Sequence, residues 1–104
     1  MTALAVIDGG ANGVAEQVAG LPALVRRAAD ALAGAETAAE VLDAKATASF
    51  AYDAAKAAAR FAKSKGAFDE VMASVYRSQA DALEIEAMAK RRLADEYDAA
   101  QQRG

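Results

Sequence analysis

The chain has 104 residues, 32 of them alanine, with one proline and no cysteine, histidine or tryptophan. This length fits one domain, and the missing residue types exclude disulfides, histidine or thiol metal ligands and thiol or imidazole nucleophiles. Twelve basic and fifteen acidic side chains leave a net charge of -3, which is too small to imply wrapping of nucleic acid. Because alanine is the strongest helix former, we expect an all-α fold. Because the usual catalytic and metal-binding residue types are missing, we expect a non-catalytic protein without a cofactor or metal.

The first twenty residues carry four of the seven glycines. Glycine raises backbone entropy, which favours a flexible leader over residues 1–20 and a helical hairpin domain over 21–104. Residues 4–13 superficially look like a strand entering a phosphate loop, but their glycine spacing does not fit one. The opening residues lack the basic segment of a signal peptide, and charges interrupt every alanine-rich run. The expected location is therefore the cytoplasm, without membrane contact.

A short helix and a long helix are expected next in the chain. Pro22 suits the first turn of a helix, because a proline there loses no intrahelical hydrogen bond, and Gly34 ends this short helix. Thr37-Ala38-Ala39-Glu40 then forms a capping box, which predicts a second helix running from 37 to about 65. Gly66 follows that helix and supplies the left-handed residue that closes it.

A third helix is expected over residues 68–102, because Asp69 and Glu70 are favourable in a first turn and no breaker follows before the last residue. Helices of these lengths span roughly 43 and 52 Å, which predicts a rod. The three-residue connection predicts an antiparallel helical hairpin.

On a helical wheel the second helix has two apolar sides. The side expected to face the third helix holds Leu42, Ala46, Phe50, Ala54, Ala57 and Phe61. The opposite side of the second helix has no partner within a hairpin. Two residues that project from the third helix also have none, so a second copy should cover both. These predicted oligomer-interface residues are Val41, Ala48, Tyr52, Ala55, Ala59, Ile85 and Met88. We therefore expect a homodimer whose four long helices form a bundle.

Two polar residues, Gln79 and Glu86, lie seven positions apart on one face of the third helix. One interpretation makes them register-setting residues that bond to lysine, to Tyr52 or to each other across the interface. The other makes Glu86 half of a paired acid/base or metal site with a second copy, although no histidine accompanies it.

Two basic clusters offer candidate phosphate contacts. One is formed by Lys56, Arg60, Lys63 and Lys65 near the end of the second helix, and the other by Lys90, Arg91 and Arg92. Cations are also favourable near a helix C-terminus, and neighbouring carboxylates provide i,i+4 partners for both clusters. Nucleic acid is therefore a candidate partner that the sequence does not favour.

The third helix contains Ile85-Glu86-Ala87-Met88-Ala89-Lys90-Arg91-Arg92-Leu93, and the second ends in Ala59-Arg60-Phe61-Ala62-Lys63. Residues 38–104 resemble a helical segment near the start of uncharacterised proteins carried by bacteriophages and other mobile elements of bacteria. In those proteins, the segment has an Ile-x-x-x-Ala-x-Arg-Arg-Leu stretch after a helix that ends in Ala-x-x-Ala-Lys. Ala94 stands where such segments often have glycine, and Met88 interrupts a usually more charged face. The resemblance implies an assembly segment and transfers no catalytic residue.

The function expected from these observations is that of a helical oligomerisation or protein-binding module encoded by a mobile element. One alternative is a small phage inhibitor that binds a host nuclease or defence complex through an acidic helical face. That face would hold Glu84, Asp95, Glu96 and Asp98. A second alternative is a DNA-binding regulator that uses the two basic clusters.

Overall fold

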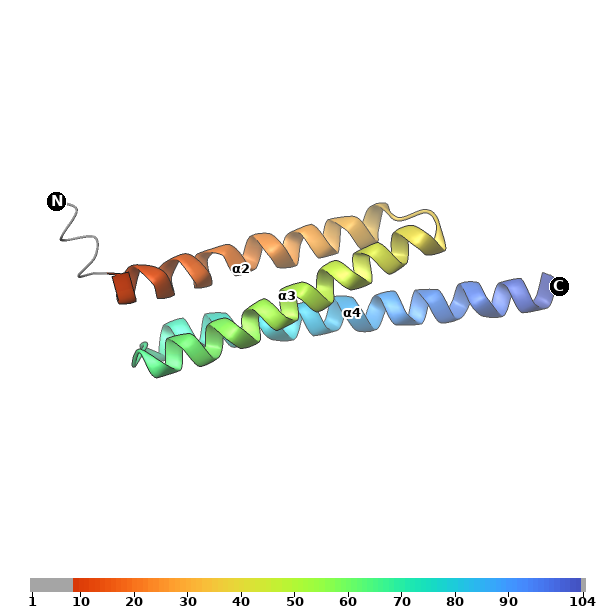
Figure 1. Cartoon of the computed structure of the whole chain (residues 1–104). Coiled ribbons are helices and arrows are strands. Elements are labelled where there is room, and N and C mark those ends of the chain that lie inside the picture. The colour runs from red at the N-terminus through yellow and green to blue at the C-terminus, as the bar shows by residue number, and fades with distance from the viewer. Residues whose placement is uncertain (1–8, 104) are drawn as a thin grey trace.

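The structure is a computed structural model that describes residues 9–103 as three helices, with no strand in that range. Helix α2 spans Gly9–Gly34, α3 spans Ala38–Ser64 and α4 spans Asp69–Arg103. Figure 1 shows the three lying side by side, with α3 running antiparallel to both neighbours. The predicted all-α fold with a long antiparallel hairpin is confirmed.

The predictions for the N-terminal part were wrong in two respects. Helix α2 is long and leaves no leader between residues 9 and 20. Residues 1–8 of the predicted leader lie outside the described residues. Pro22 lies inside α2 and not in its first turn. Its side chain is exposed, and on an outer face water can solvate the carbonyl group that a proline leaves without its helical partner.

The apolar spacing of α2 explains why it continues through the glycines and the proline. Val14, Leu21, Ala28 and Leu32 are buried, and Val18 and Val25 are partly buried. These residues recur every three or four positions, so one stripe of α2 faces the other two helices along most of its length. Burial of this stripe outweighs the weak helix propensity of Gly13, Gly20 and Pro22.

The start of α3 follows the predicted capping box with one difference. The Glu40 backbone N–H donates to the Thr37 hydroxyl at 3.1 Å, as expected. The Glu40 carboxylate accepts from the Thr37 hydroxyl at 3.1 Å and from the Glu36 backbone N–H at 3.2 Å, one residue earlier than predicted. Together these bonds fix where the α2–α3 connection ends and α3 begins.

The turn between α3 and α4 is closed by a backbone motif around Gly66. Its N–H donates to the Lys63 carbonyl oxygen at 3.1 Å, and the Ala67 N–H donates to the Ala62 carbonyl oxygen at 3.0 Å. Gly66 has φ of 70°, the left-handed conformation that was predicted for it. The bond pattern is that of a Schellman motif, and it sends the chain back along α3.

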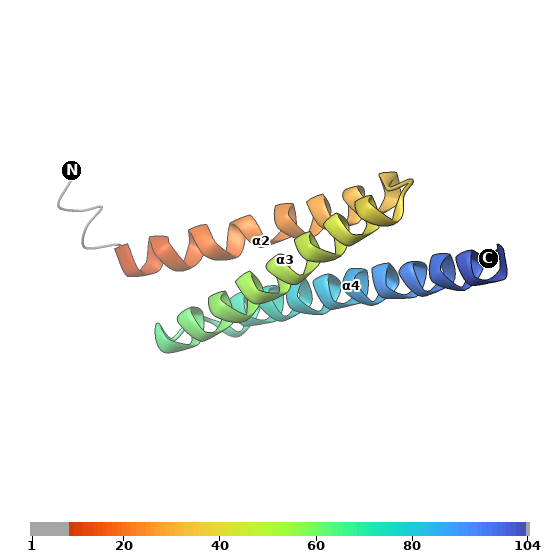
Figure 2. The ribbon, with the colours of Figure 1, turned by 45° about the vertical axis from the view of Figure 1, so that its right-hand side comes forward.

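The interior is built mostly from alanine, with a few larger apolar residues. Its larger buried side chains are Val14, Leu21, Leu32, Val41, Val75 and Ile85. Small side chains let helix axes approach closely, so each helix contacts both of the others. The result is a rod with principal extents of 65 × 25 × 15 Å and a radius of gyration of 17.5 Å, as the helix lengths predicted. The rotated view in Figure 2 shows the C-terminal end of α4 extending beyond the α2–α3 connection.

Candidate interaction surface

The structure inverts the predicted orientation of α3. Of the stripe expected to face α4, Leu42 is 54% exposed and Phe50 is 61% exposed, and Ala46 and Ala57 are exposed as well. The opposite, alanine-rich side is the one that faces α2 and α4. The prediction was wrong because a wheel gives the angle of each side chain but not the space available, and the close helix packing has no room for Leu42 or Phe50.

Five of the seven residues predicted to form an oligomer interface lie in the interior of this chain. They are Val41, Ala48, Ala55, Ala59 and Ile85. Tyr52 is partly buried, and Met88 is 44% exposed. Helix α2 covers the side of α3 that was predicted to contact a second copy. These five residues therefore have almost no exposed surface for a partner to contact.

Large apolar side chains are nevertheless exposed on the outside of the rod. They are Leu42 and Phe50 on α3, Phe68 beside the α3–α4 turn, and Tyr76, Leu83, Met88 and Tyr97 on α4. Phe68 and Tyr97 are the most exposed of these side chains, at 82% and 65%. These side chains are candidates for contact with another polypeptide, which contiguous exposed apolar patches typically mark.

One polar contact between α3 and α4 uses a predicted register residue. The Ser49 hydroxyl donates to the Glu86 carboxylate at 2.6 Å in a partly buried position. The bond fixes the axial position of one helix against the other, but within one chain and with Ser49 in place of lysine or Tyr52. Gln79 is partly buried on α4, about two turns from Glu86.

The three basic residues predicted as phosphate contacts do not form one surface. Lys90 and Arg91 are exposed, and successive helical positions point about 100° apart. Arg92 turns towards the end of α2, where its guanidinium donates to the carbonyl oxygen of Leu32 at 3.0 Å and to that of Ala35. Arg92 therefore caps α2, a role that sequence spacing alone could not reveal.

Arg92 also pairs with Glu96, one of the four residues of the predicted acidic face. Its Nε lies 3.8 Å from the Glu96 carboxylate, which is the i,i+4 pairing expected for this cluster. Glu96 is partly buried beside the α2–α3 connection, whereas Glu84, Asp95 and Asp98 are exposed. Only Glu96 leaves the predicted face, because Glu84, Asp95 and Asp98 lie within about 60° of arc at ~100° per residue.

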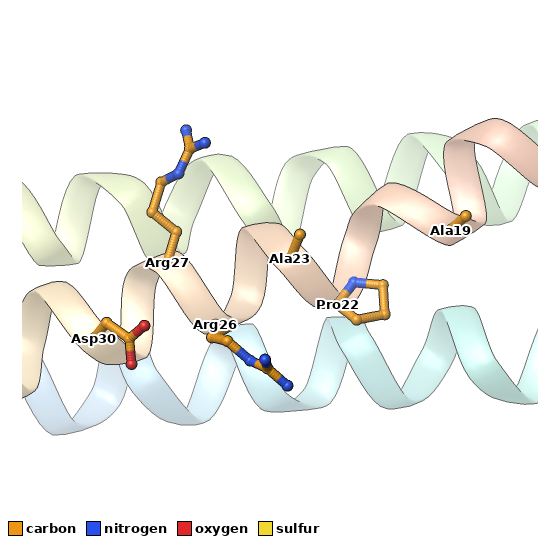
Figure 3. A pocket seen from close by; sticks show the side chains of 6 residues that line it. All are labelled: Ala19, Pro22, Ala23, Arg26, Arg27 and Asp30. Carbon is orange, nitrogen blue, oxygen red and sulfur yellow. The ribbon is translucent and has the colours of Figure 1, made fainter.

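Several hollows mark the surface of the described residues, and two of them bear on ligand binding. Figure 3 shows the first, lined by Ala19, Pro22, Ala23, Arg26, Arg27 and Asp30 of α2 alone, with the other helices behind it. Because one helix supplies the whole lining, no polar groups converge from several elements as a ligand site needs.

The second hollow, of about 620 Å³, lies between α2 and the α3–α4 turn. Its lining is apolar apart from Lys65, and the exposed Phe68 forms part of it. It extends the exposed apolar surface to the end of the rod. Among the described residues, no group of three or more acidic side chains is placed to hold a metal ion, and no helix is long and apolar enough to cross a bilayer.

No family model, curated protein or solved structure matches this chain. The function of the chain is therefore inferred from its own surface.

Proposed function

We propose that this protein is a helical oligomerisation and protein-interaction module, which acts by presenting apolar helix faces to another polypeptide and not by chemistry. The observation that supports this is the set of seven large apolar side chains left between 44% and 82% exposed. The inward sides of the three helices already pack against one another, so nothing in residues 9–103 remains to cover these seven side chains.

A second copy of the chain is the first partner to consider. The alanine face that the sequence predicts as the dimer contact is covered by α2 and is not available to a second copy. The exposed residues on α3 and α4 replace it, since burying a large apolar side chain contributes about 1.5–3 kcal/mol. Several such contacts on each copy would support a stable homodimer.

Size-exclusion chromatography with light scattering tests self-association directly. The chain mass is 10.7 kDa, and we expect about twice that mass at micromolar concentration. Circular dichroism of the same sample should show a helical, cooperatively folded protein. A folded monomer over the whole accessible concentration range would contradict self-association as the function.

A further inference from the structure

One long side of the α3–α4 hairpin is not covered by α2. A hollow between α2 and α3 is lined by Glu40 and Asp43 of α3, and a hollow between α2 and α4 is lined by Ser74, Arg77 and Asp81 of α4. These residues mark the sides of α3 and α4 that border α2. The opposite side of each helix, about 180° away, belongs to what we call the far face of the hairpin.

The far face is basic. At about 100° per residue, the charged residues within roughly 35° of these opposite directions are Lys45, Lys56 and Lys63 on α3, and Glu86 and Lys90 on α4. The Glu86 carboxylate already accepts a hydrogen bond from Ser49, which joins the two helices across this face. The single ion pair in residues 9–103 joins Arg92 and Glu96, so no carboxylate of that range pairs with the four lysines. A chain with a net charge of -3 therefore gathers positive charge on one face.

The middle of the far face is apolar. Leu83 is 51% exposed on α4, and Tyr52 is partly buried on α3. The antiparallel register set by the hydrogen bond between the helices places Tyr52 level with Leu83, and Lys45 level with Lys90. Lys56 lies about one turn from Tyr52 in the other direction along α3. The far face thus presents apolar surface with lysines on both sides of it along the rod.

From this arrangement we infer that the far face binds an acidic amphipathic helix of a partner protein, which lies along the line between α3 and α4. This inference rests on the proposed protein-binding role and specifies its surface and the chemistry of its partner. Such a helix would place an apolar stripe against Tyr52 and Leu83 and its carboxylates beside the lysines. Because α2 packs on the other side of the hairpin, the partner helix would be the fourth helix of a bundle.

A second copy of the chain and a nucleic acid both fit this face less well. The acidic side of α4 holds Glu84, Asp95 and Asp98, but Met88 is the one large apolar residue that borders it. A phosphate backbone presents negative charge without an aliphatic surface for Leu83. An acidic amphipathic helix supplies both the charge and the apolar surface that the far face matches.

Fluorescence anisotropy with two labelled peptides tests the charge of the partner. Both are designed helices of about 18 residues, which span the distance from Lys45 to Lys63 at ~1.5 Å per residue. They share one leucine stripe, which is flanked by glutamate in one peptide and by lysine in the other. We expect the acidic peptide to bind at least ~10-fold more tightly, and added salt to weaken it. Equal binding of the two peptides, no binding of the acidic peptide at ~100 μM, or tighter binding of duplex DNA would overturn the inference.

Two matched pairs of variants test the surface itself. Lys56→Glu should weaken binding of the acidic peptide ~10-fold, whereas Arg91→Glu makes the same charge change on another side of α4 and should alter binding less than ~2-fold. Leu83→Ser should weaken binding ~5-fold, and Met88→Ser should alter it less than ~2-fold. All four side chains are exposed, so circular dichroism should show unchanged helical content. Equal effects within either pair would overturn the far face as the site.

The two proposals fail separately, because peptide binding does not require self-association. A monomeric chain that binds the acidic peptide would contradict the homodimer and support the far face as the site. A dimer that does not bind this peptide would overturn the far face and leave self-association standing.

Discussion

Arg92 provides the sharpest test of how this fold is held together, because one side chain of α4 holds the C-terminal end of α2 and the connection that follows it. It projects from α4 and donates to the Leu32 and Ala35 carbonyl oxygens at the end of α2, just before α3 begins. A hydrogen bond from a charged donor contributes about 1.5–3 kcal/mol, and a cation at a helix C-terminus is also favourable. The side chain is 36% exposed, so water compensates part of any loss. The surface pair with Glu96 adds little.

For Arg92→Met, which keeps the apolar stem and removes the donors, we therefore expect a loss of about 2 kcal/mol in the free energy of unfolding. In a domain of this size such a loss lowers Tm by roughly 8–16 °C. Urea denaturation followed by circular dichroism at fixed protein concentration measures it. Arg91→Met, one position away and exposed, is the matched control and should change stability by less than ~0.5 kcal/mol. Equal small effects of both variants would refute the capping role of Arg92.

The same denaturation assay tests three other features of the structure. Gly20→Ala should raise the free energy of unfolding by about 0.5–1 kcal/mol, because Gly20 is helical and its added Cβ meets nothing within 4 Å. Gly66→Ala should lower it by about 1–2 kcal/mol, because φ of 70° strains any residue with a Cβ; equal effects of the two glycine changes would contradict this. In a double-mutant cycle with Ser49→Ala and Glu86→Ala, we expect a coupling of ~0.5–1.5 kcal/mol, and additive effects would show that their hydrogen bond does not contribute.

Local signals in the sequence were sufficient for both ends of α3 and the start of α4. Thr37 and Glu40 lie three residues apart, and Gly66 follows directly after the last turn that it closes. Such motifs depend on a few neighbouring residues, so they can be recognised without knowledge of the fold. The lengths of α3 and α4 and the rod shape follow from these ends.

The N-terminal half of α2 was missed although the sequence contains its signal. Val14, Val18, Leu21, Val25 and Leu32 repeat with helical spacing across the predicted boundary at residue 20. Glycine and proline were given more weight than this repeat, and the burial of the stripe against two helices prevails over their propensity. The Arg92 cap had no comparable signal, because it joins positions 57 and 60 residues apart in the chain.

The prediction of which helix sides are buried and which are exposed was wrong for a reason that also bears on function. Large apolar residues were expected inside and alanines at a contact with a second copy, but the structure packs Ala44, Ala48 and Ala55 inside and leaves Leu42 and Phe50 outside. A core of alanine contributes little transfer free energy per residue, so close helix packing must supply much of the stability of the single chain. That same close packing leaves the larger apolar side chains on the surface, where burial against another polypeptide adds stabilisation that the interior does not provide. Folding and association are thus expected to be coupled, and Phe50→Ser should lower the concentration dependence of Tm while changing Tm little at the lowest protein concentration.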